Sequence, residues 1–354
     1  MAYTTIDKPS DYFRIKLYAG NAAANRAITW DETDTNMQPD MLWFKSRTDT
    51  QSHCLFDSVR GAVLRLIPNS GDAEGTENTN LDSFDTNGFQ VDAEAIVNGS
   101  SRNYVTWGWK AGTSFTNDAS STGIGGIDSA GSFNNTAGFS IVTYTGNAGN
   151  TTVKHGMNVA PSMIIFKRRN ANSTNWYTYH ASIGQGKRLV LNTTATEAAD
   201  TEYMNNTAPT TSVFSLGPSG TVNTTGTHLA YCFAEKKGYS KFGIYTGNNN
   251  ADGTFIFTGF KPAFVMVKLT DTQTDGWVIQ DNKRDISNTG TSTRLRANTA
   301  GAEFTSTNEI DFLSNGFKPR GDDGEINGNG SKHIYMAFAE NPFVTSTGVP
   351  ATAR

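Results

Sequence analysis

Glutamates and histidines recur at matching places in the sequence, and both residue types can carry acid–base chemistry. Glu235 and Glu340 each follow an apolar run, and His228 and His333 each begin one. A carboxylate or an imidazole could serve as a general acid or base. Because the same residues occur in two copies of one pattern, we interpret the glutamates as scaffold residues that pair with a lysine or accept turn amides. The histidines are interpreted as strand-edge residues.

Other titratable residues lack the pattern of a known catalytic arrangement. His180 and Asp200 could belong to a Ser-His-Asp triad, but no Gly-x-Ser-x-Gly motif accompanies them. Glu74 and Glu77 could flank a glycosidic bond, but their Gly-, Asn- and Thr-rich surroundings indicate a solvated loop. The sequence therefore predicts no catalytic residue.

No metal or cofactor site is predicted either. The segment Asp322–Asn329 offers closely spaced oxygen ligands of the kind calcium accepts, but its spacing is not that of an EF-hand. We interpret it as a turn-rich acidic loop, with calcium binding left open. The five histidines and two cysteines show no His-x-x-x-His or Cys-x-x-Cys pattern.

Aromatic residues offer a third kind of chemistry, stacking against sugars. Tyr177 and Tyr179 are the candidates for such a surface role. The tryptophans that fall in predicted strands are instead expected in the core; these are Trp43, Trp107, Trp109, Trp176 and Trp277.

The composition favours short strands and tight turns and excludes several classes of partner. Only 18% of the 354 residues are charged, against roughly 25% in an average soluble domain. The net charge of −4 and the absence of a basic block exclude a nucleic-acid partner. No apolar run approaches the roughly 20 residues that cross a bilayer, so no membrane insertion is expected. The segment Met1–Pro9 resembles no secretory signal, and Cys54 and Cys232 are expected to be reduced and buried.

An internal repeat organises the chain. Three openings of alternating apolar and polar residues end in Gly-Asn, which is typical of a strand entering a turn; they are 13–21, 139–147 and, one residue pair shorter, 242–248. Each opening leads to a proline and a second strand that ends in a lysine; the lysines are Lys45, Lys167 and Lys268. Their spacing indicates units of about 100 to 125 residues, the size of a β-sandwich.

These features predict an all-β protein of three tandem divergent β-sandwich units, of jelly-roll or lectin-like type. We place the first unit, with an N-terminal segment and a linker, at residues 1–133. The second spans 134–238, and the third, with a C-terminal tail, spans 239–354. The Gly-, Ser-, Thr- and Asn-rich segment 112–135 is interpreted as a linker or long loop. Residues 196–204 could form one or two helical turns.

Four segments resemble a functionally ill-defined family of marine phage proteins, including those of cyanophages, that are described as tail-fibre-like. The segments are 231–235, 238–248, 311–318 and 334–343. The resemblance implies a virion structural protein, made in the host bacterial cytoplasm and located on the virion surface. It also implies a homo-oligomer, by analogy a trimer. Other virion proteins are the expected partners, and a host cell-surface glycan is a candidate ligand.

Three functions are left open by the sequence. The first is a tail-fibre or receptor-binding protein that acts by non-catalytic adhesion and is not an enzyme. The second is a capsid or tail decoration protein that stabilises a lattice. The third is a polysaccharide depolymerase. The receptor, the location in tail or capsid, the oligomeric state and the binding loops do not follow from the sequence.

Overall fold

Nearly all the regular structure of the described residues consists of antiparallel strands, which confirms the all-β prediction. The computed structural model describes residues 3–285, 288, 290–307 and 310–352. Besides strands, these residues form one 3-10 turn and two single-turn helices: η1 (Pro9–Asp11), α1 (Ala119–Thr122) and α2 (Gly324–Asn327). None of the described helices is long and apolar enough to cross a membrane.

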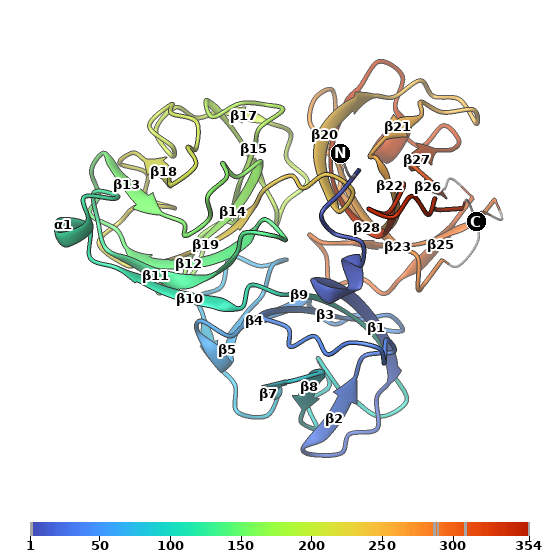
Figure 1. The fold of residues 1–354 in the computed structure, drawn as a ribbon, viewed down its shortest axis with the longest axis horizontal. Coiled ribbons are helices and arrows are strands. Elements are labelled where there is room, and N and C mark those ends of the chain that lie inside the picture. Colours follow the sequence, from blue (N-terminus) through green and yellow to red (C-terminus); the bar gives the residue numbers. More distant parts are fainter. Residues whose placement is uncertain (1–2, 286–287, 289, 308–309, 353–354) are drawn as a thin grey trace.

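Three large sheets share one central strand order (Figure 1). The first consists of β1 (Phe13–Ala19), β9 (Asn103–Trp109), β3 (Met41–Ser46), β4 (Cys54–Asp57), β5 (Gly61–Leu66) and β6 (Gly75–Thr76). The third consists of β20 (Ser240–Thr246), β28 (Lys332–Pro342), β22 (Phe260–Leu269), β23 (Trp277–Asp281), β24 (Ser292–Arg296) and β25 (Phe304–Ser306).

The second large sheet repeats this order and adds two strands at one edge. Its common strands are β12 (Phe139–Thr145), β19 (Thr227–Phe233), β14 (Met163–Arg168), β15 (Tyr177–His180), β16 (Lys187–Val190) and β17 (Ala198–Ala199). The added strands are β10 (Thr113–Asn117) and β11 (Ser129–Asn134), and β11 pairs with β12.

A small sheet packs on one face of each large sheet and completes a sandwich. The small sheets are β2 (Arg26–Thr29), β8 (Gly88–Val91) and β7 (Leu81–Asp85); β13 (Thr151–Lys154) and β18 (Val213–Leu216); and β21 (Ile256–Phe257), β27 (Gly316–Pro319) and β26 (Ile310–Leu313). Each sandwich encloses its own apolar core. We refer to strands β1–β9, β10–β19 and β20–β28 as the first, second and third sandwich.

The opposite faces of the three large sheets share a single central core. The three sandwiches surround a common centre, as Figure 1 shows. Trp107, Tyr231 and Met336, one from each sandwich, belong to one cluster of buried residues. Both cysteines are free and buried, as expected. The sandwiches are therefore joined by a shared apolar interior and are not separate beads on a chain.

Buried polar groups join neighbouring sandwiches at matching positions. Tyr231 of the second sandwich donates its hydroxyl to Asp57 Oδ2 of the first, at 2.7 Å. Trp107 of the first donates Nε1 to Asp281 Oδ2 of the third, at 3.1 Å. The registers place Asp57 opposite Met41 and Asp281 opposite Phe264. Met41 and Phe264 each lie four residues before the lysine that recurs in the central strand, Lys45 or Lys268. The same kind of hydrogen bond, from a buried aromatic side chain to an aspartate, therefore joins the sandwiches at two of the three seams.

The seam between the second and third sandwiches replaces this contact. His180 stands where the other two sheets have aspartate, and Met336 stands where they have Trp107 or Tyr231. His180 Nε2 lies 3.2 Å from the backbone oxygen of Tyr335 instead. Both the aspartate and the side chain that donates to it are absent from this seam, so no buried carboxylate is left without a hydrogen-bond donor.

Backbone bonds close the three sandwiches into a ring. In every seam an N–H of one sandwich donates to a carbonyl just after a central strand of another: Glu74 to Arg169 at 2.8 Å, Glu197 to Thr270 at 2.7 Å and Glu303 to Arg47 at 2.9 Å. Arg169 and Arg47 also pair with the side chains of Glu74 and Glu303, each at 2.8 Å. The first sandwich contacts the second, the second the third, and the third the first, in an approximately threefold arrangement.

The repeated lysines are buried at these seams. Lys167 Nζ donates to Gly71 O of the first sandwich, and Lys268 Nζ donates to Thr194 O of the second, both at 3.1 Å. Burial lowers the pKa of Lys45, Lys167 and Lys268 to about 8. The sequence places these lysines at matching points. In the structure Lys167 and Lys268 bond across seams, whereas Lys45 Nζ donates to Ser46 O of its own sandwich at 2.7 Å.

Three details of the sequence interpretation were wrong. The third opening is not shorter, because Ser240 pairs with Phe338 as Phe13 pairs with Trp109. The predicted linker 112–135 contains β10, α1 and β11, and strand pairing assigns these to the second sheet and not to a unit ending at residue 133. Residues 196–204 contain β17 and turns instead of helix. The other predicted domain limits stay predictions.

Candidate functional site

The recurring glutamates lie at the surface or at a seam. Glu235 is exposed and pairs with Lys241 at 3.0 Å. Glu340 lies 3.4 Å from Lys261 and accepts a hydrogen bond from Asn282 Nδ2 at 2.8 Å. Each glutamate therefore has a lysine neighbour, the arrangement expected of scaffold residues.

The recurring histidines are buried rather than placed at strand edges. His228 stacks on Tyr144 with centroids 5.3 Å apart, and His333 stacks on Tyr245 at 5.0 Å. Tyr104 of the first sandwich stacks on Tyr18 at 5.2 Å in the same way. Burial lowers the pKa of His228 to about 4 and also lowers that of His333, so both rings are neutral at pH 7. Ring stacking is their visible role.

The structure does not join His180 to Asp200. His180 is buried at a seam, whereas Asp200 pairs with Arg188 at 2.7 Å. Glu74 is not a solvated loop residue, because it bridges Arg60 and Arg169, each at 2.8 Å. Glu77 pairs with Arg65 at 2.6 Å.

The acidic loop 322–329 uses its oxygens within the protein. Asp323 caps α2 and pairs with Arg294 at 2.5 Å. Glu325 pairs with Arg296 at 2.6 Å. Among the described residues, no group of three or more His, Cys, Asp or Glu is placed to hold a metal ion.

The aromatic candidates are largely covered. Tyr179 is buried, and Arg188 lies over the half-buried ring of Tyr177 at 4.2 Å. The five strand tryptophans are buried as expected; they are Trp43, Trp107, Trp109, Trp176 and Trp277.

The added hairpin of the second sandwich is where the repeat is broken. Asp118 caps α1 by accepting from Ser121 N at 3.1 Å, and Gly123 ends the turn at φ 66°. The buried Asn117 donates to Ile124 O at 2.8 Å and accepts from Thr122 at 2.8 Å. These hydrogen bonds fix the short connection between β10 and β11, which has no large apolar core of its own.

Three neighbouring hollows follow this hairpin, and together they are called the cleft. Its widest part, about 630 Å³, lies over β10, β11 and β12 and ends at Arg169 and Thr227. A middle part of about 380 Å³ shares Ala130 with it and reaches Ser58 of the first sandwich. A third part of about 290 Å³ shares Asp40 with the middle part and ends at Lys110. The widest part is therefore lined by the second sandwich alone, whereas the middle and third parts include residues of the first sandwich.

Side chains with hydroxyl or amide groups are frequent in the lining of the cleft; they are Asn36, Gln38, Ser58, Thr86, Ser114, Thr116, Asn117, Ser129, Ser132, Thr143, Thr145 and Thr227. Phe115 borders the middle part, but its half-buried ring packs edge-on against Phe133 at 6.0 Å on the core of the second sandwich. Such a lining suits an uncharged ligand with many hydroxyl groups, since it offers donors and acceptors beside an apolar surface.

The acidic groups of the cleft already have partners, and so does Arg169. Asp118 accepts from Ser120 and Ser121, and Asp128 accepts from Ala119 N at 2.9 Å. Asp40 accepts from Ser58 at 2.7 Å and Ala111 N at 2.8 Å, and burial raises the pKa of its carboxyl. Arg169 pairs with Glu74.

Sequence reasoning missed this cleft because it interpreted segment 112–135 as a linker. The available signal was Phe115 and Phe133, two aromatic residues in an otherwise polar stretch, because aromatic residues favour strands.

A comparison with family models adds one finding. A model described as a domain of unknown function, DUF7483, matches residues 8–342. No curated protein and no solved structure matches the chain.

Proposed function

We propose that this chain, which belongs to the DUF7483 family, is a surface protein of bacteriophage virions that acts by non-catalytic adhesion, in the manner of a tail fibre or receptor-binding protein. The observation that carries the adhesive part is the cleft beside the added hairpin. The shared strands build the ring, and the one large addition to the repeat creates the widest hollow. The phage assignment rests on the sequence resemblance.

A host cell-surface glycan is the ligand that this cleft fits best. Thr116, Thr145 and Thr227 are exposed along its widest part, where they can exchange water for sugar hydroxyls. The five residues of β10 span roughly 16 Å, at about 3.3 Å per residue, so several sugar rings could lie along the strand.

Adhesion accounts for the cleft better than glycan cleavage. A glycosidase needs two carboxyl groups free to act on one bond. Asp118 and Asp128 are engaged in holding the hairpin turn instead. Release of reducing ends from host polysaccharide, lost on substitution of either aspartate, would overturn the adhesive assignment in favour of a depolymerase.

A decoration protein is the second candidate, and the ring favours it. Three similar sandwiches in one closed chain present an approximately threefold surface. A single chain could therefore occupy a threefold position of a viral lattice.

Glycan binding with cleft variants tests the proposal. Purified host surface polysaccharide should bind the wild-type chain, and Thr227→Trp, which fills the widest part, should weaken binding at least tenfold. Thr211→Trp, at an exposed threonine outside the cleft, is the matched control. Equal binding by both variants would remove the cleft from the proposal, and no binding to any host polysaccharide would remove the glycan.

A further inference from the structure

A second groove runs beside the edge strand β1, between the first and third sandwiches. It has a volume of about 340 Å³ and is lined by Phe13, Arg14 and Ile15 on one side and by Ala263, Asn282 and Lys283 on the other. In the second sandwich the equivalent strand is β12, since Phe13 pairs with Trp109 as Phe139 pairs with Phe233.

The chain itself fills the space beside β12. There β11 pairs along the strand, with Ser132 opposite Ile141 and Gly131 opposite Val142. The hairpin of β10 and β11 also borders Asp40 and Ser58 of the first sandwich. Their equivalents in the third sandwich are Ala263 and Asn282, which border the open groove beside β1. The groove therefore corresponds to a place that holds a strand elsewhere in the same molecule.

Within the described part of the chain, the outer edge of β1 has no strand partner beside this groove. Among the described residues, no backbone hydrogen bond joins residues 13–18 to any segment other than β9. Asn282 Oδ1 and Glu32 Oε2 are buried without a hydrogen bond, and both residues line the groove. Glu32 Oε2 lies 3.9 Å from Arg14 Nε, which is an ion pair but too long for a hydrogen bond. The open edge of β1 therefore favours a ligand that supplies backbone N–H and C=O groups.

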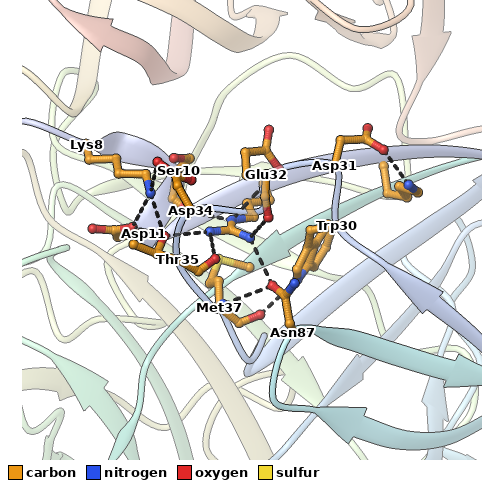
Figure 2. A network of polar contacts seen from close by, with 12 residues as sticks. Lys8, Ser10, Asp11, Trp30, Asp31, Glu32, Asp34, Thr35, Met37 and Asn87 are labelled. Atoms are coloured by element: carbon orange, nitrogen blue, oxygen red, sulfur yellow. Dashed lines mark hydrogen bonds and ion pairs between the residues drawn. The ribbon is translucent and has the colours of Figure 1, made fainter.

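Neighbouring contacts hold the wall of the groove in place. Arg14 donates to Ser10 O at 2.6 Å and to Thr35 O at 2.8 Å, and Asn87 Oδ1 accepts from it at 3.0 Å. Figure 2 shows Glu32 beside this network, together with Ser10, Thr35 and Asn87. The wall is thus preorganised, which reduces the entropy lost on binding.

We propose that this groove binds an extended segment of another protein chain, which adds to β1 as β11 adds to β12. The segment supplies backbone N–H and C=O groups to the free edge of β1, the mode known as strand addition. The residue opposite Ile15 is small, because its counterpart Ser132 is buried. The segment is also uncharged, because both lysines beside the groove already have acidic partners. Lys16 pairs with Asp31, and Lys283 pairs with Asp31 and Glu32.

A peptide that copies residues 129–135, with blocked ends, is the probe. Hydrogen exchange of the full chain, read by mass spectrometry at peptide resolution, reports where it binds. We expect added protection in residues 13–18 and none in β10 or β20. Protection elsewhere, or no binding at millimolar peptide, would overturn the proposal.

Two groove variants and one control give the test its specificity. Ala263→Phe fills the groove and should weaken peptide binding at least tenfold, whereas Ala27→Phe, at an exposed residue of β2, should not. Should Ala263→Phe fail to fold, Lys283→Trp replaces it, because Lys283 has a partly exposed side chain in the same groove. This variant should also weaken peptide binding at least tenfold. Unchanged binding by the folded groove variants contradicts the site. A chain that dimerises without peptide, with β1 protected in the dimer, contradicts the choice of occupant, since a second copy would then fill the groove.

Discussion

Buried side chains that could do acid–base chemistry serve the interior of this protein instead. His228 and His333 stack on tyrosines, and Asp57 and Asp281 accept hydrogen bonds across seams. The repeat explains this, because a residue that recurs at equivalent positions of several sandwiches serves the fold that these sandwiches share.

Tyr231→Phe should lower the free energy of unfolding by about 1.5–3 kcal/mol, because it removes a buried hydrogen bond to the Asp57 carboxylate. Tyr245→Phe is the matched control. Its hydroxyl donates to the neutral Ile326 O, and its loss should cost about 0.5–1.5 kcal/mol. Urea denaturation measures both, and an equal or smaller cost for Tyr231→Phe would contradict the role of the seam contact.

Acid should destabilise the protein through its buried histidines. Burial lowers the pKa of His155, His180 and His228 to about 4, whereas the unfolded value is near 6.5. The unfolded chain therefore binds more protons, so stability is complete above about pH 6.5 and falls as the pH drops toward 4. Each histidine contributes up to about 1.4 kcal/mol per pH unit to this slope.

His228→Tyr isolates one such histidine, because the first sandwich already has a tyrosine, Tyr104, at the equivalent stacked position. Unfolding measured at pH 7, 6 and 5 should give a shallower slope for this variant than for the wild type. A slope that does not change would show that His228 is not protonated on unfolding.

Strands were the elements that the sequence predicted best, because short apolar runs and period-two alternation are both local patterns. The three lysine-ended strands are β3, β14 and β22, at or next to the predicted positions. The seams and the hairpin could not be predicted in this way. They depend on contacts such as Tyr231 with Asp57, which lie 174 residues apart in the chain. Polar composition also hid β10 and β11, since Thr and Ser suit both loops and edge strands.

Gly131→Ala tests the added hairpin as an element. A Cβ at this position would lie 1.9 Å from Ile141 O, so β11 must shift away from β12. We expect a loss of about 1–3 kcal/mol in unfolding free energy, together with weaker glycan binding. Gly149→Ala is the control, because its Cβ would meet only Asn147 Oδ1 at 3.8 Å, and it should change stability by less than about 0.5 kcal/mol. Two equal effects would mean that the close pairing of β11 with β12 contributes little.

At the scale of the whole molecule, the ring makes the sandwiches mutually dependent. They share one central core and are joined at all three seams. A single unfolding transition should follow, with calorimetric and van't Hoff enthalpies that agree. Residues 239–352 expressed alone should not fold, because the face that lines the central core would be exposed. Three separate transitions would contradict the shared core.

The position and copy number of the protein in intact virions test the central claim most directly. Quantitative mass spectrometry of purified phage, combined with cryo-electron microscopy, gives both. The adhesive account predicts a few copies at the tail tip. Absence from virions would contradict a virion role altogether, and hundreds of copies over the head or tail tube would contradict adhesion and assign the ring to lattice decoration.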